Sequence, residues 1–152
     1  MHDVSAAELL TVWDRALGQS PTRQALVLLA AVCPDRSMEQ LAQWSVGRRD
    51  ACLLTVHERL FGSQLNGVTV CPQCRQHIEL AFNVTDIRVE PTMADPLVPV
   101  DQVMTLTAEG YRVQFRLPNS LDLEALGTSA DVNQLREQLF HRCLTSVVWE
   151  GA

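Results

Sequence analysis

The chain changes character in residues 66–84, which read NGVTVCPQCRQHIELAFNV. The Asn-Gly pair at its start is a turn signal, and residues 68–70 predict a short strand. Apolar and polar residues alternate over residues 78–84, a period of two that predicts a half-buried strand. The sequence therefore predicts a β-hairpin with Cys71 and Cys74 at its tip.

Helical patterns fill the part of the chain that precedes this stretch. Serines that can cap a helix stand at four starts, two of them in capping boxes and one before a proline. These serines are Ser5, Ser20, Ser37 and Ser45. The longest apolar run, residues 25–33, is too short to cross a bilayer and predicts a buried helix. We expect a helical subdomain over residues 1–62.

Residues after the hairpin predict a linker, a second hairpin and a helix. Three prolines mark residues 90–101 as a linker. Alternating strands on either side of Glu109-Gly110 predict a second hairpin, followed by a short helix and a last helix from about Asp131 to Val147.

The predicted fold class is α+β. An N-terminal helical bundle precedes a CPxC zinc-ribbon-like β-hairpin (63–89), the linker (90–101), and a second β-hairpin with a C-terminal helix (102–152).

Composition narrows the class of function. The chain has 152 residues, a net charge of −6 and no lysine. This acidic balance argues against nucleic acid as a partner, because phosphate binding depends on clustered cations. The N-terminus has no apolar targeting segment, and nothing in the sequence predicts a membrane partner. We expect a cytoplasmic protein, and the odd number of cysteines, five, also disfavours a disulfide framework.

The Cys-Pro-Gln-Cys turn is the chemically distinctive feature. Two cysteines at this spacing can chelate one zinc ion, but a structural zinc site has four ligands. His77 is the nearest candidate for a third ligand. The other cysteines, Cys33, Cys52 and Cys143, fit buried thiols in helical stripes better than ligands.

Two other interpretations of the turn remain open. It can be a structural knuckle without metal, or a redox pair. A redox pair requires a low pKa at Cys71, which a helix N-terminus usually provides. A strand follows the cysteines here, so the context fits redox chemistry poorly.

Catalytic motifs are missing from the sequence: it contains no GxSxG, HExxH, P-loop or GxGxxG. Arg48 and Arg49 stand at a helix start. They fit a solvated face, with partner binding as the alternative. The tryptophans Trp13, Trp44 and Trp149 are expected to pack rather than to form binding hot spots.

An ordered series of short stretches resembles one family. They are residues 13–21, 25–33, 46–51, 53–54, 61–62 and 71–74, and finally 116–123, which read RLPNSLDL. Together they resemble the T4-like bacteriophage baseplate hub assembly chaperones, encoded with contractile tails and tail-like injection systems. The resemblance extends over most of the chain, from about Leu9 to Cys143.

The resemblance implies an accessory protein that binds baseplate hub or spike proteins and performs no catalysis. It also implies a second Cys-Pro-x-Cys pair beyond the Cys143 helix, which would complete a four-cysteine zinc ribbon. Without such a pair, zinc needs His77, a lone cysteine or a second subunit. Arg75 departs from the glycine that often follows the second cysteine of a knuckle.

The leading hypothesis is therefore a non-enzymatic assembly chaperone or adaptor in the cytoplasm of a bacterial cell or phage-infected host. The alternative is a zinc-ribbon-type binding module with a regulatory role. A thiol oxidoreductase is the third hypothesis. The sequence leaves open whether the protein forms a homo-oligomer.

Overall fold

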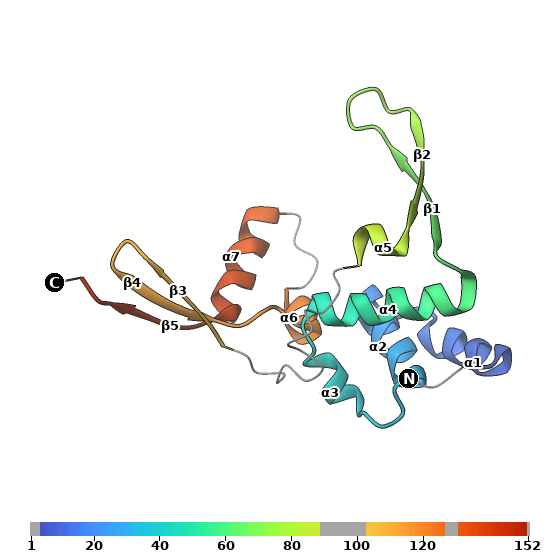
Figure 1. Cartoon of the computed structure of the whole chain (residues 1–152), viewed down its shortest axis with the longest axis horizontal. Helices are drawn as coiled ribbons and strands as arrows, with labels where there is room; N and C mark the ends of the chain where they lie inside the picture. The colour runs from blue at the N-terminus through green and yellow to red at the C-terminus, as the bar shows by residue number, and fades with distance from the viewer. Residues whose placement is uncertain (1–3, 89–102, 127–130, 152) are drawn as a thin grey trace.

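The structure is a computed structural model that describes residues 4–88, 103–126 and 131–151. It confirms the α+β class, with helices in the N-terminal part and two small antiparallel sheets. The N-terminal helices gather at one end of the molecule and both sheets project away from them, while the C-terminal helix lies beside the second sheet (Figure 1). The predicted linker at residues 90–101 lies outside the described residues.

The N-terminal part contains α1 (Ala6–Ala16), α2 (Pro21–Val32), α3 (Met38–Ala42) and α4 (Val46–Phe61). All four predicted serine caps are confirmed: each serine hydroxyl accepts a hydrogen bond from a backbone N–H in the first turn. Ser5 and Ser37 also form the predicted capping boxes. Helix α4 ends at Gly62, whose φ of 90° favours glycine.

The hydrophobic core lies among α2, α3 and α4. It contains Leu26, Leu29, Val32, Leu41, Ala42, Trp44 and Val56. The apolar run of α2 is its centre, as the sequence predicts, and the burial of these side chains stabilises the packed helices. Both sheets lie outside this cluster.

The first sheet pairs β1 (Gln64–Val70) with β2 (His77–Asn83). The predicted turn at Asn66-Gly67 is wrong, because both residues pair with Leu80 and Ala81 in the middle of the hairpin. The predicted half-burial of β2 is also wrong, since six of its seven residues are exposed. Instead of extending the strand, Val84 begins the short helix α5 (Val84–Ile87).

The second sheet has the order β3-β4-β5, formed by β3 (Met104–Ala108), β4 (Tyr111–Phe115) and β5 (Leu144–Trp149). The predicted turn at Glu109-Gly110 is confirmed, with φ values of 50° and 80°. The helices α6 (Ser120–Ala125) and α7 (Val132–Cys143) lie between β4 and β5 in the sequence.

The predicted extent of the last helix is wrong, because residues 144–149 form a strand that pairs with β4. This segment contains threonine, two valines and tryptophan, whose side chains favour strands. Pairing with β4 satisfies its backbone groups, so β5 adds a third strand to the predicted hairpin.

Candidate functional sites

Residues 71–76 form the turn between β1 and β2, which we call the knuckle. The Cys71 N–H donates to the Gln76 carbonyl at 2.9 Å, and the Arg75 N–H donates to the Cys71 carbonyl at 2.9 Å. Arg75 has a φ of 58°, in the left-handed region. These bonds fix the turn and confirm that the cysteines lie at the tip of a hairpin.

Two backbone N–H groups of the knuckle point at the sulfur of Cys71. The N–H groups of Cys74 and Gln73 donate to the Cys71 sulfur, and they lower the pKa of this thiol below its usual value of 9.0. Hydrogen bonds to a thiolate favour the charged form. The lowered pKa meets one requirement of redox chemistry, but it arises in a strand-to-strand turn and not at a helix N-terminus. A thiolate is also the form that binds metals.

His77, the nearest candidate for a third ligand, opens β2 and pairs with Val70. Across the part of the chain that the structure describes, no group of three or more His, Cys, Asp and Glu side chains could hold a metal ion. The knuckle thus presents two thiols, which is half of a tetrahedral zinc site.

The other cysteines lie on the helices. Cys33 caps the C-terminal end of α2 and makes a side-chain hydrogen bond with Cys52 on α4. Burial, followed by the nearby Cys33, raises the pKa of Cys52 to about 11. Burial also raises the pKa of Cys143 at the end of α7. Cys52 and Cys143 are therefore poorly suited to ionise near neutral pH.

Arg48 and Arg49 lie in different environments. Arg49 is only 8% exposed, so the solvated-face interpretation is wrong for it. Its guanidinium donates to Asp50 Oδ1 at 2.8 Å and to Ser120 Oγ at 3.2 Å, which connects α4 to α6. Arg48 is half-buried and lies over the Trp44 ring, 4.4 Å from its centroid.

A buried carboxylate, Asp122, joins α6 to β4 and α7. It accepts hydrogen bonds from Arg116 at 2.8 Å, from Arg142 at 3.1 Å and from the Asn119 N–H at 3.0 Å. We call these four residues the Asp122 network. The bonds from Arg116 are the main cause that lowers the pKa of Asp122 from 3.8 to about 2, whereas burial opposes this change.

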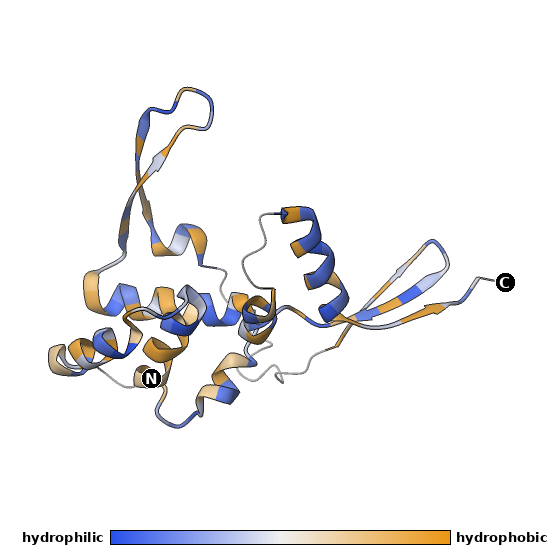
Figure 2. Cartoon of the chain, turned by 180° about the vertical axis from the view of Figure 1, so that it is seen from behind, coloured by the Kyte–Doolittle hydropathy of each residue, from blue (hydrophilic) through white to orange (hydrophobic). Residues whose placement is uncertain are grey.

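The second sheet has one apolar face and one polar face. Directly opposed residues of an antiparallel pair share a face, and the register places Leu106, Val113 and Val147 together, next to Tyr111 and Trp149. We call these five residues the apolar sheet face. Tyr111 and Trp149 contact each other edge to face at 4.6 Å. Figure 2 shows hydrophobic residues along β5, at the end of the molecule away from the helical core.

Residues 18–152 match the model of the T4 bacteriophage base plate protein family. The chain belongs to this family. The matched residues include the knuckle, the Asp122 network and the apolar sheet face. Neither the curated proteins nor the solved structures yielded a match.

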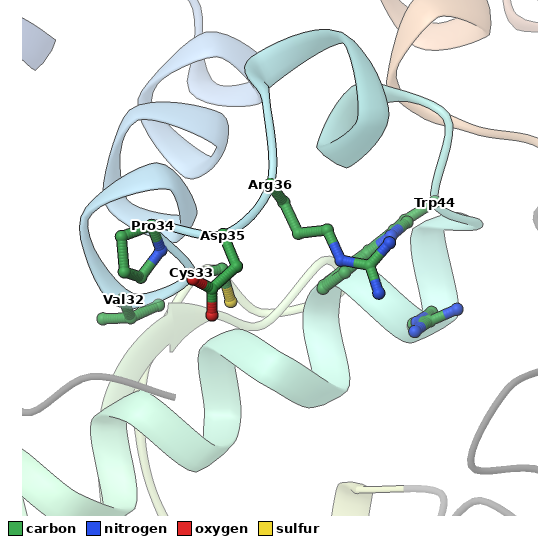
Figure 3. Close-up of a pocket in the computed structure, with 7 residues that line it drawn as sticks. Val32, Cys33, Pro34, Asp35, Arg36 and Trp44 are labelled. Carbon is green, nitrogen blue, oxygen red and sulfur yellow. The ribbon is translucent and has the colours of Figure 1, made fainter.

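The chain also has an open hollow of about 480 Å³ near the start of α4 (Figure 3). It is lined by Val32, Cys33, Pro34, Asp35, Arg36, Trp44 and Arg48. Its polar lining combines the guanidinium groups of Arg36 and Arg48 with the carboxylate of Asp35. Within the described segments, no helix has the length and apolarity to cross a membrane.

Sequence reasoning missed the exposure of two tryptophans. Trp13 and Trp149 are 66% and 57% exposed, although Trp149 also packs edge to face against Tyr111, whereas Trp44 is buried as expected. The signal for the apolar sheet face was present, because residues 111–115 alternate between apolar and polar. The sequence did not reveal that this face would remain uncovered.

Proposed function

We propose that this base plate family protein is a non-enzymatic assembly chaperone or adaptor. Its clients are hub or spike proteins of a contractile phage tail or a tail-like injection system. The chain belongs to the base plate family, and the resemblance of its sequence to hub assembly chaperones supports the finer role.

The apolar sheet face is the observation that carries this proposal. Tyr111, Val147 and Trp149 are about half exposed, although they lie side by side on one sheet. A contiguous apolar patch of this kind marks a protein-binding surface more often than a solvated one. Tyrosine and tryptophan are also enriched among residues that dominate binding energy.

The sheet offers a second means of attachment. The strands β3 and β5 are the two edges of the β3-β4-β5 sheet. An edge strand has unpaired N–H and C=O groups that can accept a strand from another chain. A client can therefore cover the apolar face and extend the sheet in the same complex.

The test is a pull-down of the tagged chain, co-expressed with the structural genes of its tail cluster. Val147 and Val148 provide a matched pair of variants, because they are neighbours on opposite faces and are 55% and 50% exposed. We expect Val147→Asp to lose the hub or spike protein and Val148→Asp to retain it. Mass spectrometry identifies the captured protein.

Both variants must remain folded, which circular dichroism can establish. If the unmodified chain captures no hub or spike protein, the proposed function is wrong. If both aspartate variants bind equally well, the function stands but the apolar sheet face is not its binding surface.

A further inference from the structure

We propose that Cys33 and Cys52 are a redox-sensitive pair, which hydrogen peroxide converts from two thiols in contact into a disulfide bond. The bond would tie the C-terminal end of α2 to α4 within the helical core. This inference does not depend on the proposed function, because it concerns the chemistry of the isolated chain.

Helical spacing places the two cysteines on facing surfaces of α2 and α4. Cys33 caps α2 one turn after Leu29, to whose carbonyl its N–H donates at 2.9 Å. Cys52 precedes Val56 by one turn of α4, so these two residues share a face of that helix. Leu29 and Val56 belong to one buried core cluster, and both cysteines pack against it. The packing of α2 on α4 therefore brings together two thiols that are distant in the sequence.

The two side chains are in direct contact. Cys33 and Cys52 make a side-chain hydrogen bond across the two helices. A disulfide requires the two sulfurs to approach to about 2.05 Å, with the two Cβ atoms about 3.5–4.5 Å apart. Thiols that already share a hydrogen bond need only a short approach to form this bond.

The hollow beside α4 decides which thiol meets the oxidant first. Cys33 is partly exposed and lines this hollow, next to Pro34 and Asp35 (Figure 3). Peroxide in solvent therefore has a path to its sulfur. Burial is the main cause of the raised pKa of Cys52, which keeps that thiol protonated, whereas peroxide reacts with thiolates. Cys33 thus reacts first and Cys52 second.

The conversion takes two steps. The Cys33 sulfur attacks one oxygen of hydrogen peroxide and becomes a sulfenic acid, while the O–O bond breaks and the other oxygen leaves as water with the thiol proton. The Cys52 sulfur then attacks the Cys33 sulfur, the S–S bond forms, and the hydroxyl group leaves as water with the Cys52 proton. Each sulfur gives up one electron, and the peroxide takes up both. Arg48 lies close enough to Cys52 for its charge to favour a thiolate in the second step.

The bond would change the helical core in a measurable way. It closes a ring that contains residues 34–51, including α3 and the side chains of Trp44 and Arg48 that line the hollow. A cross-link stabilises a fold mainly by restricting the unfolded chain. For a ring of this length we expect the thermal midpoint of the oxidised chain to rise by roughly 5–10 °C.

The experiment uses the whole chain, reduced and then freed of reductant. It is treated with hydrogen peroxide, its remaining thiols are alkylated, and it is digested with trypsin, which cleaves after arginine. Cys33 then lies in residues 24–36 and Cys52 in residues 50–59, whereas both knuckle cysteines lie in residues 60–75. Mass spectrometry without reduction should find residues 24–36 joined to residues 50–59, with a mass two hydrogen atoms below their sum. Circular dichroism on the oxidised and reduced chains measures the shift of the midpoint.

Variants and reversal separate this pair from the other cysteines. Cys52→Ala should lose both the joined peptides and the rise of the midpoint, whereas Cys143→Ser should retain both. Dithiothreitol should return the oxidised, unmodified chain to its original midpoint, which tests the bond without a mutation.

Two results would overturn the inference. One is recovery of Cys33 and Cys52 in separate peptides after the folded chain has been treated with peroxide. The other is a link between them that forms only when the chain is first unfolded in denaturant. Neither result bears on hub or spike capture by the reduced chain, so the two proposals fail independently.

Discussion

Asp122 holds a full negative charge where water hardly reaches it, since it is 1% exposed. This charge is tolerated because Arg116 and Arg142 both donate to its carboxylate. Removing one partner of a buried ion pair leaves the other charge buried and uncompensated. The resulting loss of folding stability exceeds what the intact pair contributes. The Asp122 network therefore makes the junction of α6, β4 and α7 sensitive to pH.

The first prediction follows from the sign of the pKa change. Asp122 has a folded pKa of about 2, below its usual 3.8. Its contribution to stability is therefore complete above the unfolded pKa and is lost as pH falls through the folded pKa. We expect the free energy of unfolding to fall by about 2 kcal/mol between about pH 4 and pH 2, because one pKa unit corresponds to about 1.4 kcal/mol.

Denaturant unfolding, followed by circular dichroism at a series of pH values, measures this loss. Asp122→Asn is the control: it should be less stable at neutral pH and should show a flatter dependence below about pH 4. The attribution to Asp122 fails if the variant loses as much stability on acidification as the unmodified chain does.

The second sheet depends, as an element, on the close contact between its first turn and its last strand. Gly110 lies in the β3-β4 turn with a φ of 80°. A Cβ atom at this position would lie 2.8 Å from Cζ3 of Trp149 on β5. Glycine therefore suits position 110 for two reasons: it adopts the left-handed backbone conformation readily, and it leaves space for the indole ring of Trp149.

The second prediction is that Gly110→Ala destabilises the protein by about 1–3 kcal/mol, the range for strained backbone positions. The matched control is Gly47→Ala in α4, where an added Cβ meets no atom within 4 Å. That change should raise stability by roughly 0.5 kcal/mol, because alanine favours helix. Thermal unfolding followed by circular dichroism distinguishes the two variants, and equal effects would contradict the argument.

Local sequence predicted the helix starts well and the strands less well. Each serine cap bonds within its own first turn, so the information is local. Asn66-Gly67 is a local turn signal that pairing with residues 80–81 overrides. Likewise Val147 fitted the apolar stripe of a helix, but the backbone of residues 144–149 pairs with β4, a contact distant in sequence.

The candidate sites could be predicted only in part, for the same reason: some of them depend on contacts between residues that are distant in the sequence. The knuckle follows from its own residues and was predicted. The Asp122 network and the burial of Arg49 require partners that are far apart in sequence, such as Arg49 and Ser120. The residues of the apolar sheet face could be inferred from alternation, but its exposure depends on which elements fail to cover it.

Residues 118–120, which lead into α6, contact the start of α4 in the helical core. The Val46 N–H donates to the Pro118 carbonyl at 2.9 Å, and Ser45 forms an isolated bridge with Asn119. Arg49 adds the side-chain bond to Ser120, which is fully buried. Because Arg49 lies at this junction, we assign it a structural role and leave partner contact to its neighbour Arg48.

The third prediction separates these roles. Arg49→Ala should lower the free energy of unfolding by about 1–3 kcal/mol, because it removes the guanidinium that donates to the buried Ser120 hydroxyl. Arg48→Ala should lower it by less, about 0.5–1 kcal/mol, the worth of a half-exposed cation–π contact. Denaturant unfolding compares the two variants.

The pull-down then tests Arg48: reduced capture of the hub or spike protein by a stable Arg48→Ala chain would place the hollow beside α4 in the binding surface. If Arg49→Ala proves as stable as the unmodified chain but fails to capture the client, Arg49 contacts the partner and its structural assignment is wrong.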